Sequence, residues 1–292
     1  MKAETKTKTT TPGNSFGVVL IAFNHAYFHK AYNLAFSIHY FNPDIKITVH
    51  VDSVYDFNIA LADWKSKEFD QVIEHKEYFR DFAEVKLNID RFAVYDRSLY
   101  LDVDTICLKD VAPLFEQLKD SDYKTEVNTD FMLWATREQT EKHYGFTPDD
   151  YIPSVNSSVQ YIAKGGTATK IFDAARAAHS NPILVKELHN TWGGTQPDEL
   201  YLNVGIAKNR FDAAFEKGPV FFTTKISHEY EKLKDFYYFL SYFGPRGHTP
   251  YYYTNYMDVE LKRMQQERGQ RHTNESRVSN LINFKYANKR RK

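Results

Sequence analysis

Apolar residues recur along the first half of the chain in two alternating patterns. A continuous apolar run at 17–23 is typical of a strand that is covered on both faces of a sheet, and the segment at 45–52 predicts the next strand. Between them, apolar residues from Ala31 to Ile38 recur at helical spacing. The same patterns predict further strands at 71–74, 99–104, 131–137 and 157–164, and further helices at 63–69, 85–95, 113–118 and 168–178. This order predicts an α/β fold, a mostly parallel sheet with helices on both faces.

The segment SLYLDVDTICLKDV, from Ser98 to Val111, places two acids on one face of an apolar strand. With a period of two, one face holds Leu99, Leu101, Val103 and Thr105, and the other holds Tyr100, Asp102, Asp104 and Ile106. Like charges buried without partners are costly. Two carboxylates at the carboxyl end of such a strand favour a site for a hard divalent cation, and the alternative is that they cap the strand and the next turn.

Composition excludes several classes of protein and site. The 292 residues include 38 basic and 38 acidic side chains, so net charge indicates no partner. The single cysteine, Cys107, excludes an internal disulfide framework and suits a reducing compartment. No apolar run has the length of a membrane span, and the first residues lack the apolar core of a signal peptide. We therefore expect a soluble, cytoplasmic protein.

The two ends of the chain differ from its middle. Residues 1–15 are polar and of low complexity, which predicts a disordered lead. Residues 16–260 contain no linker and form one expected domain, and 261–292 form a tail with a net charge of +8. This tail is either a solvated end or a surface for an anionic acceptor, a membrane or a nucleic acid. We expect an irregular C-terminal part that is rich in aromatic residues, with eleven between Tyr230 and Tyr256. These residues either stack on sugars or bases or form a small core.

The segment LYLDVDTICLKDVAPLF resembles the DxD segment of nucleotide-sugar glycosyltransferases with the GT-A fold. The likeness is to the group that contains glycogenin and bacterial lipopolysaccharide galactosyl- and glucosyltransferases. It extends from about Gly17 to Asn203, with the family's segments in the family's order. The resemblance implies a Rossmann-like GT-A catalytic domain over 16–260.

The resemblance assigns donor-binding roles to two early segments. The turn Ala22, Phe23 and Asn24 would hold the base and ribose of the nucleotide, although Asn24 is equally a candidate helix N-cap. Lys86 stands where the family has a basic residue that reaches the donor, and a solvated helix face is the alternative. Val103, between the two aspartates, belongs to the same donor-binding set.

Two later segments match family motifs with one departure each. In VNSSV, Asn156 and Ser157 would contact the donor sugar, while Ser158 replaces the usual glycine. A turn-forming asparagine is the alternative for this motif. In PDELYLN, Asp198 and Glu199 would face the sugar as catalytic-site carboxylates, where the family more often has glutamine at the position of Glu199. A proline followed by two acids also explains itself as a helix start.

The resemblance implies Mn²⁺ or Mg²⁺ bound by Asp102 and Asp104. The family's third ligand is a histidine, and here a serine occupies that position. Of the nearby residues we expect His248 as the ligand, with His228 as the alternative, and Arg246 as a contact of the diphosphate. A lone histidine in a loop is otherwise simply exposed.

The implied function is metal-dependent transfer of a hexose or pentose from a nucleotide-diphosphate sugar, most simply a UDP-sugar, to an acceptor. The acceptor is a glycan, a lipid-linked sugar or a protein on this reading. One alternative keeps the chemistry and places the sugar on a nucleic-acid base, as in phage DNA-modifying glycosyltransferases. Another is a non-catalytic module that binds a nucleotide or a sugar.

Overall fold

A six-stranded sheet forms the centre of the fold in the computed structural model, which describes residues 15–61, 68–128, 135–183, 197–222, 232–241 and 251–268. Its strands lie in the order β3-β2-β1-β4-β7-β6. They are β1 (Phe16–Ala22), β2 (Lys46–Val51), β3 (Gln71–Glu74), β4 (Arg97–Leu101), β6 (Tyr123–Asn128) and β7 (Ser154–Ala163). The first four in this order are parallel, and β7 alone runs against them, because it pairs antiparallel with both β4 and β6. This confirms the predicted mostly parallel sheet.

A second, three-stranded sheet lies beside the first. It contains β5 (Thr105–Cys107), β9 (Phe239–Ser241) and β8 (Val220–Phe222), in that order. The strands that come after residue 182, β8 and β9, belong to this sheet and not to the main one, because β9 pairs with β5 and with β8. Residues 102–104 thus connect a strand of one sheet to a strand of the other.

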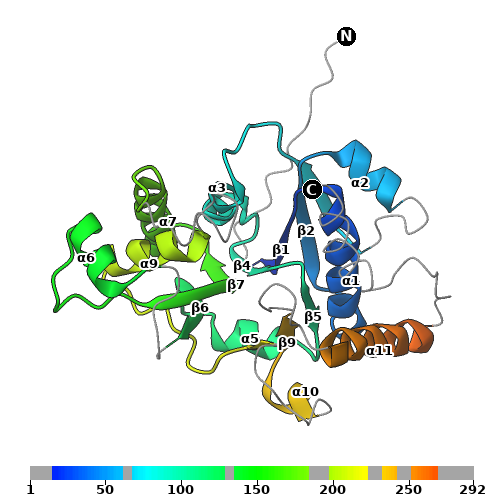
Figure 1. Cartoon of the computed structure of the whole chain (residues 1–292). Coiled ribbons are helices and arrows are strands. Elements are labelled where there is room, and N and C mark those ends of the chain that lie inside the picture. The colour runs from blue at the N-terminus through cyan, green and yellow to red at the C-terminus, as the bar shows by residue number, and fades with distance from the viewer. Residues whose placement is uncertain are drawn as a thin grey trace.

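Helices cover both faces of the main sheet (Figure 1). The helices whose buried residues share one core cluster with β5 lie on one side: α1 (His25–Phe41), α2 (Val54–Ala60), α5 (Ala112–Gln117) and α11 (Tyr251–Glu267). On the other side lie α3 (Phe82–Lys86), α4 (Ile89–Phe92), α7 (Gly166–His179) and α9 (Asp198–Lys208). The remaining helices are α6 (Arg137–Tyr144) and α10 (Leu233–Phe236). No helix within the described ranges is long and apolar enough to cross a lipid bilayer.

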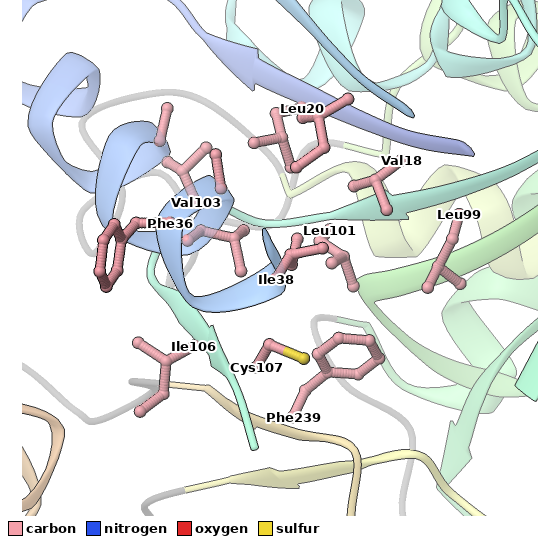
Figure 2. Close-up of a cluster of buried hydrophobic side chains, with 14 of the residues drawn as sticks. Val18, Leu20, Phe36, Ile38, Leu99, Leu101, Val103, Ile106, Cys107 and Phe239 are labelled. Atoms are coloured by element: carbon pink, nitrogen blue, oxygen red, sulfur yellow. The ribbon is translucent and has the colours of Figure 1, made fainter. Parts of the chain in front are cut away.

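The alternation of side chains along the strands divides the core in two. Leu99, Leu101 and Val103 face the α1 side, where they pack with α1 and with the second sheet (Figure 2). Tyr100 faces the α9 side. Ile106, predicted on the face of Tyr100, lies in the α1-side core, because the chain has left the strand at residue 102.

The predicted helix over 85–95 is two short helices, α3 and α4. Asn88 interrupts it, because its side-chain amide donates to the carbonyl of Glu84 (2.7 Å). Such side-chain bonds to the backbone compete with continued helix. Lys86 is consequently the last residue of α3, not a residue on a continuous helical face.

Two other predicted elements differ from the structure. Residues 131–134 of the predicted strand lie outside the described residues, and Thr136 begins α6 with a capping box to Gln139. The predicted exposed helix at 63–69 also falls mostly outside them. Of this segment the structure describes Glu68 and Phe69, which are buried and lie at a turn. Glu68 pairs there with His39 (2.7 Å).

The C-terminal part adds to the core on the α1 side. Helix α11 runs through residue 260, where the expected domain ends and the basic tail begins, and Leu261 and Met264 are buried. Of the aromatic residues of this part, Phe239 is buried in the core, and Tyr237 and Tyr238 pack against it. For these three, the structure favours a core role over sugar stacking.

Candidate functional site

The DxD aspartates lie at the carboxyl edge of the main sheet. Asp102 follows β4 directly, and Asp104 lies in the turn before β5. Both are half-buried. The backbone N–H of Asp102 donates to the carbonyl of Ser158 on β7 (2.8 Å), and the Tyr100 hydroxyl donates to its carboxylate (2.5 Å). Asp102 is therefore fixed in place from two strands.

Lys86 joins this aspartate to the other acid pair. Its ammonium, buried at the end of α3, lies 3.2 Å from both carboxylate oxygens of Asp102 and 3.3 Å from Asp198. It also donates to the hydroxyl of Ser157 (2.8 Å). Burial favours the neutral amine, but the charges of Asp102, Asp198 and Glu199 outweigh it and raise the pKa of Lys86 above its ordinary value.

Asp198 and Glu199 are the first two residues of α9, and Pro197 is its N-cap. Both acids are buried, with 6% and 8% of their surface exposed. Burial, followed by the charge of Asp198, raises the pKa of Glu199 to about 8, although Lys86 and the backbone of Ser157 act in the opposite direction. Glu199 is therefore a neutral carboxylic acid at pH 7 and can donate a hydrogen bond.

A bulge in β7 shapes the floor of the site. The pairing with β6 jumps between Thr125 and Glu126, which oppose Gln160 and Asn156. The extra residues of β7 include Ser157 and Ser158, the two partners of Lys86 and Asp102. The side-chain oxygen of Asn156 accepts the N–H of Ser158 (3.0 Å), so this asparagine stabilises the bulge. Bulges of this kind commonly redirect side chains next to active sites.

The predicted donor turn lies at the same sheet edge. Asn24 is the N-cap of α1, as the structural alternative predicted, and its N–H donates to Asp52 at the end of β2 (2.9 Å). Its φ of 85° is in the left-handed region, a strained conformation for this residue. Phe23 packs beside the ring of His75 (5.9 Å between ring centroids). Ala22 is fully buried, so only its backbone is available to a ligand.

The remaining predicted residues divide into two groups. The side chain of Val103 points into the hydrophobic core (Figure 2), which leaves its backbone for donor contacts. Arg246, His248 and the alternative His228 lie outside the described residues. Among the residues that are described, no group of three or more His, Cys, Asp or Glu side chains could hold a metal ion.

Three site residues were missed by the sequence reasoning. Tyr100 lies on the predicted face of Asp102, so the period-two pattern already contained its signal. Tyr27 and Lys30 lie one turn apart on α1, and the Lys30 ammonium is 4.9 Å from the centroid of the Tyr27 ring. The charges of Asp104 and Asp102 act on both, adding to the burial that raises the pKa of Tyr27. A helical pattern of apolar residues gives no signal for such a polar pair.

The two aspartates of DxD suit a cation. Burial, followed by the charge of Asp102, raises the pKa of Asp104 to about 6, and the positive charges of Lys30 and Lys86 partly oppose this. The second carboxylate thus lacks a full counter-charge. Mg²⁺ and Mn²⁺ are commonly held by one or two carboxylates together with phosphate oxygens and water. The donor set present therefore fits such an ion without a third protein ligand.

A separate groove lies at the opposite end of α9. It has a volume of about 690 Å³ and is lined by 147–151 and by residues from Ile206 to Asp212. None of the site residues described above lines it. At 1.5 Å per residue, the eight steps from Asp198 to Ile206 place it roughly 12 Å along the helix from the acids.

Comparisons with known proteins identify the fold. No protein-family model matches the sequence, and no curated protein matches it. The galactosyltransferase LgtC, solved in complex with donor and acceptor sugar analogs, matches with a TM-score of 0.51 and 16% identity, over 89% of this chain and 98% of that chain. The glycosyltransferase GlyE of Streptococcus pneumoniae TIGR4 matches with a TM-score of 0.52 and 16% identity, over 87% of this chain and 63% of that chain.

A second structure of LgtC, in which an active-site glutamine is replaced by glutamate, matches with a TM-score of 0.51 and 17% identity, over 86% of this chain and 95% of that chain. The LgtC matches extend over nearly the whole of both chains, so they compare entire folds and not one shared motif. The chain therefore has the GT-A fold of these glycosyltransferases.

Proposed function

We propose that this protein transfers a sugar from a nucleotide-diphosphate sugar to an acceptor. The observation that supports this most directly is the position of Lys86, whose ammonium contacts Asp102 and Asp198 at the carboxyl edge of a GT-A sheet. Ligands of open α/β sheets bind at this edge. A buried cation between two acid pairs is a costly arrangement for stability alone, which favours a role in ligand binding.

Asp102 and Asp104 are the proposed ligands of a Mn²⁺ or Mg²⁺ ion, completed by oxygens of the donor diphosphate. Such an ion, when bound, acts as a Lewis acid that neutralises the diphosphate as the sugar departs. The protein's own contribution is orientation. Tyr100 and the carbonyl of Ser158 fix Asp102, so that one carboxylate of the pair is preorganised before the donor arrives.

The second acid pair is proposed to hold the sugar. Glu199 is protonated at neutral pH because its pKa is raised to about 8, which makes it a poor nucleophile and a poor base. A neutral acid can instead donate a hydrogen bond to a sugar hydroxyl, as an amide side chain does. The LgtC mutant with glutamate in place of an active-site glutamine has the same fold, so a carboxyl group at an active-site amide position is compatible with that fold.

The proposed donor is a UDP-sugar and the proposed acceptor is a sugar. The LgtC structure contains donor and acceptor sugar analogs, and the resemblance of the DxD segment is to enzymes with nucleotide-sugar donors. The turn Ala22–Asn24, at the end of β1, is the proposed contact for the nucleotide. Asn156 and Ser157, from the bulge in β7, are proposed contacts of the donor sugar.

Donor hydrolysis and transfer test this proposal. A thermal-shift screen of nucleotide sugars with and without Mn²⁺ should first identify the donor, because a ligand that binds the native state raises the Tm. With that donor, turnover should require the metal, should stop with EDTA, and should fall by at least about a hundredfold in Asp102→Ala and Asp104→Ala.

The matched control is Asp120→Ala, which removes an exposed acid in a loop outside the site. Its turnover should equal that of the wild type. Unchanged turnover in both DxD variants and in EDTA would exclude this mechanism, and nucleotide binding without metal dependence or turnover would instead indicate a non-catalytic binding module.

A further inference from the structure

Lys30 lies in the second turn of α1. Helix α1 begins directly after β1, and β1 is the neighbour of β4, the strand that leads into Asp102. The first turns of α1 therefore start at the same sheet edge as the acid pair. Lys30 is half-buried there, and it is the only lysine or arginine of α1.

An aromatic stack holds this side chain. The ammonium of Lys30 lies 4.9 Å from the ring centroid of Tyr27, a distance suited to a cation–π interaction. The Tyr27 ring is in turn stacked on Phe82 of α3, with ring centroids 6.1 Å apart and an interplanar angle of 18°. Helix α3 also ends in Lys86, so each of the two helices that form this aromatic contact carries one of the two lysines.

The two lysines differ in their partners. Lys86 contacts two aspartates and a hydroxyl, whereas Lys30 has no hydrogen bond or ion pair with any other described residue. Its Nζ thus keeps its donors for a ligand. Burial lowers the pKa of Lys30, and the negative charges of Asp104 and Asp102 oppose this. A half-buried ammonium without an acceptor is costly unless a bound anion supplies one.

We propose that Lys30 binds a phosphate oxygen of the donor's diphosphate, as a second protein cation beside the DxD ion. This inference rests on the proposed function. A divalent ion would balance Asp102 and Asp104, and Lys86 is already paired with Asp198, so Lys30 supplies the positive charge left for the diphosphate. A lysine ammonium is a compact point charge with three donors, which suits the oxygens of a phosphate.

Calorimetric binding of UDP, with uridine as the matched ligand, tests the proposal without depending on turnover. In Lys30→Met, the affinity for UDP should fall about tenfold or more with Mn²⁺ present, while the affinity for uridine should not change. Lys30→Arg keeps the charge and should recover most of the affinity. Lys46→Met, an exposed lysine at the amino end of β2, is the control and should bind UDP as the wild type does.

Three outcomes would overturn the inference. The first is equal UDP affinity in the wild type and in both Lys30→Met and Lys30→Gln, the second variant serving if the first does not fold. The second is a parallel loss of UDP and uridine affinity, which would mean that Lys30 only supports the Tyr27 ring. In both, weakened UDP binding by Asp102→Ala would leave the proposed function standing. The third, a wild type that binds no UDP, would overturn both.

Discussion

The two acid pairs of the site have different environments. Asp102 and Asp104 leave the end of a strand and remain partly accessible, whereas Asp198 and Glu199 begin a helix and are buried. One lysine, Lys86, contacts one member of each pair. The pairs therefore share a counter-charge, although they are far apart in the sequence.

Asp104 and Glu199, the two acids that lack a direct contact with Lys86, differ in their pKa values because they are buried to different extents. The pKa of Asp104 is raised to about 6, and the pKa of the more buried Glu199 is raised to about 8. At neutral pH, Asp104 is thus largely ionised and can bind a cation, while Glu199 is neutral and can donate a hydrogen bond. A shared lysine and a difference in burial thus give two carboxyl groups of one site opposite roles.

Removal of the shared lysine should have the largest effect. Lys86→Met leaves the carboxylates of Asp102 and Asp198 without their buried counter-ion, which we expect to lower the free energy of unfolding by about 3–5 kcal/mol. Urea unfolding at pH 7 measures this. The exposed-lysine variant Lys46→Met should stay within about 0.5 kcal/mol of the wild type, and an equal effect of both substitutions would show that the two pairs do not depend on Lys86.

The pH dependence of stability tests the raised pKa of Glu199. Between the ordinary pKa of 4.5 and about 8, Glu199 holds a proton in the folded protein that the unfolded chain has released. Stability contributed by this group is thus present below pH 4.5 and is lost as the pH rises toward 8. Glu199→Gln cannot ionise, so it should be more stable than the wild type, by on the order of a few kcal/mol at pH 8 and by little at pH 5.

Urea unfolding of the wild type and of Glu199→Gln at several pH values checks this expectation. The isosteric Gln side chain keeps the size of the group, so packing should contribute little to the difference. A constant difference from pH 5 to pH 8 would contradict a raised pKa at Glu199.

Removal of the Tyr100 hydroxyl tests how much its hydrogen bond contributes to holding Asp102 in place. Tyr100→Phe removes a hydrogen bond to the carboxylate of Asp102 and should cost about 1.5–3 kcal/mol of stability, the usual range for a bond to a charged group. It should also weaken binding of Mn²⁺ with UDP, which calorimetry measures. The comparison is Tyr123→Phe, which loses a hydrogen bond to the neutral side chain of Gln160. A larger loss of stability in Tyr123→Phe than in Tyr100→Phe, measured by thermal unfolding, would contradict this expectation.

Ser158 should show the smallest effect. Its contact with Asp102 is made by the backbone carbonyl, so Ser158→Gly keeps the bond and restores the residue usual in the resembling family. We expect donor affinity within about twofold of the wild type. A loss as large as that of Tyr100→Phe would mean that the serine hydroxyl itself takes part in the site.

The sequence contained more of the sheet than of the site. A continuous apolar run predicted β1, as is typical of a strand covered on both faces, and apolar-rich segments predicted β2 and β4. The face shared by Tyr100 and Asp102 was equally readable, since it depends only on the period of a strand. These are local properties of a short segment.

The parts that were missed depend on long-range contacts. The split of the predicted helix at Asn88 follows from one side-chain bond to Glu84, and the second sheet forms because β9 pairs with β5, which is more than a hundred residues earlier. Lys86 was placed as a donor contact with a solvated face as its alternative, but its burial between two acid pairs requires α9 to be in place. No spacing within the segment encodes that.

The three residues from Asp102 to Asp104 form the joint between the two sheets, and this has a mechanical consequence. On one side of the joint Asp102 is bonded to β7 and to Lys86, whereas on the other side Asp104 leads directly into β5, which pairs with β9. The gap between the two carboxylates is therefore set by how the small sheet is seated. A substitution in the packing of the small sheet, such as Phe239→Leu, should therefore change the affinity of the site for its cation although Phe239 does not contact the aspartates.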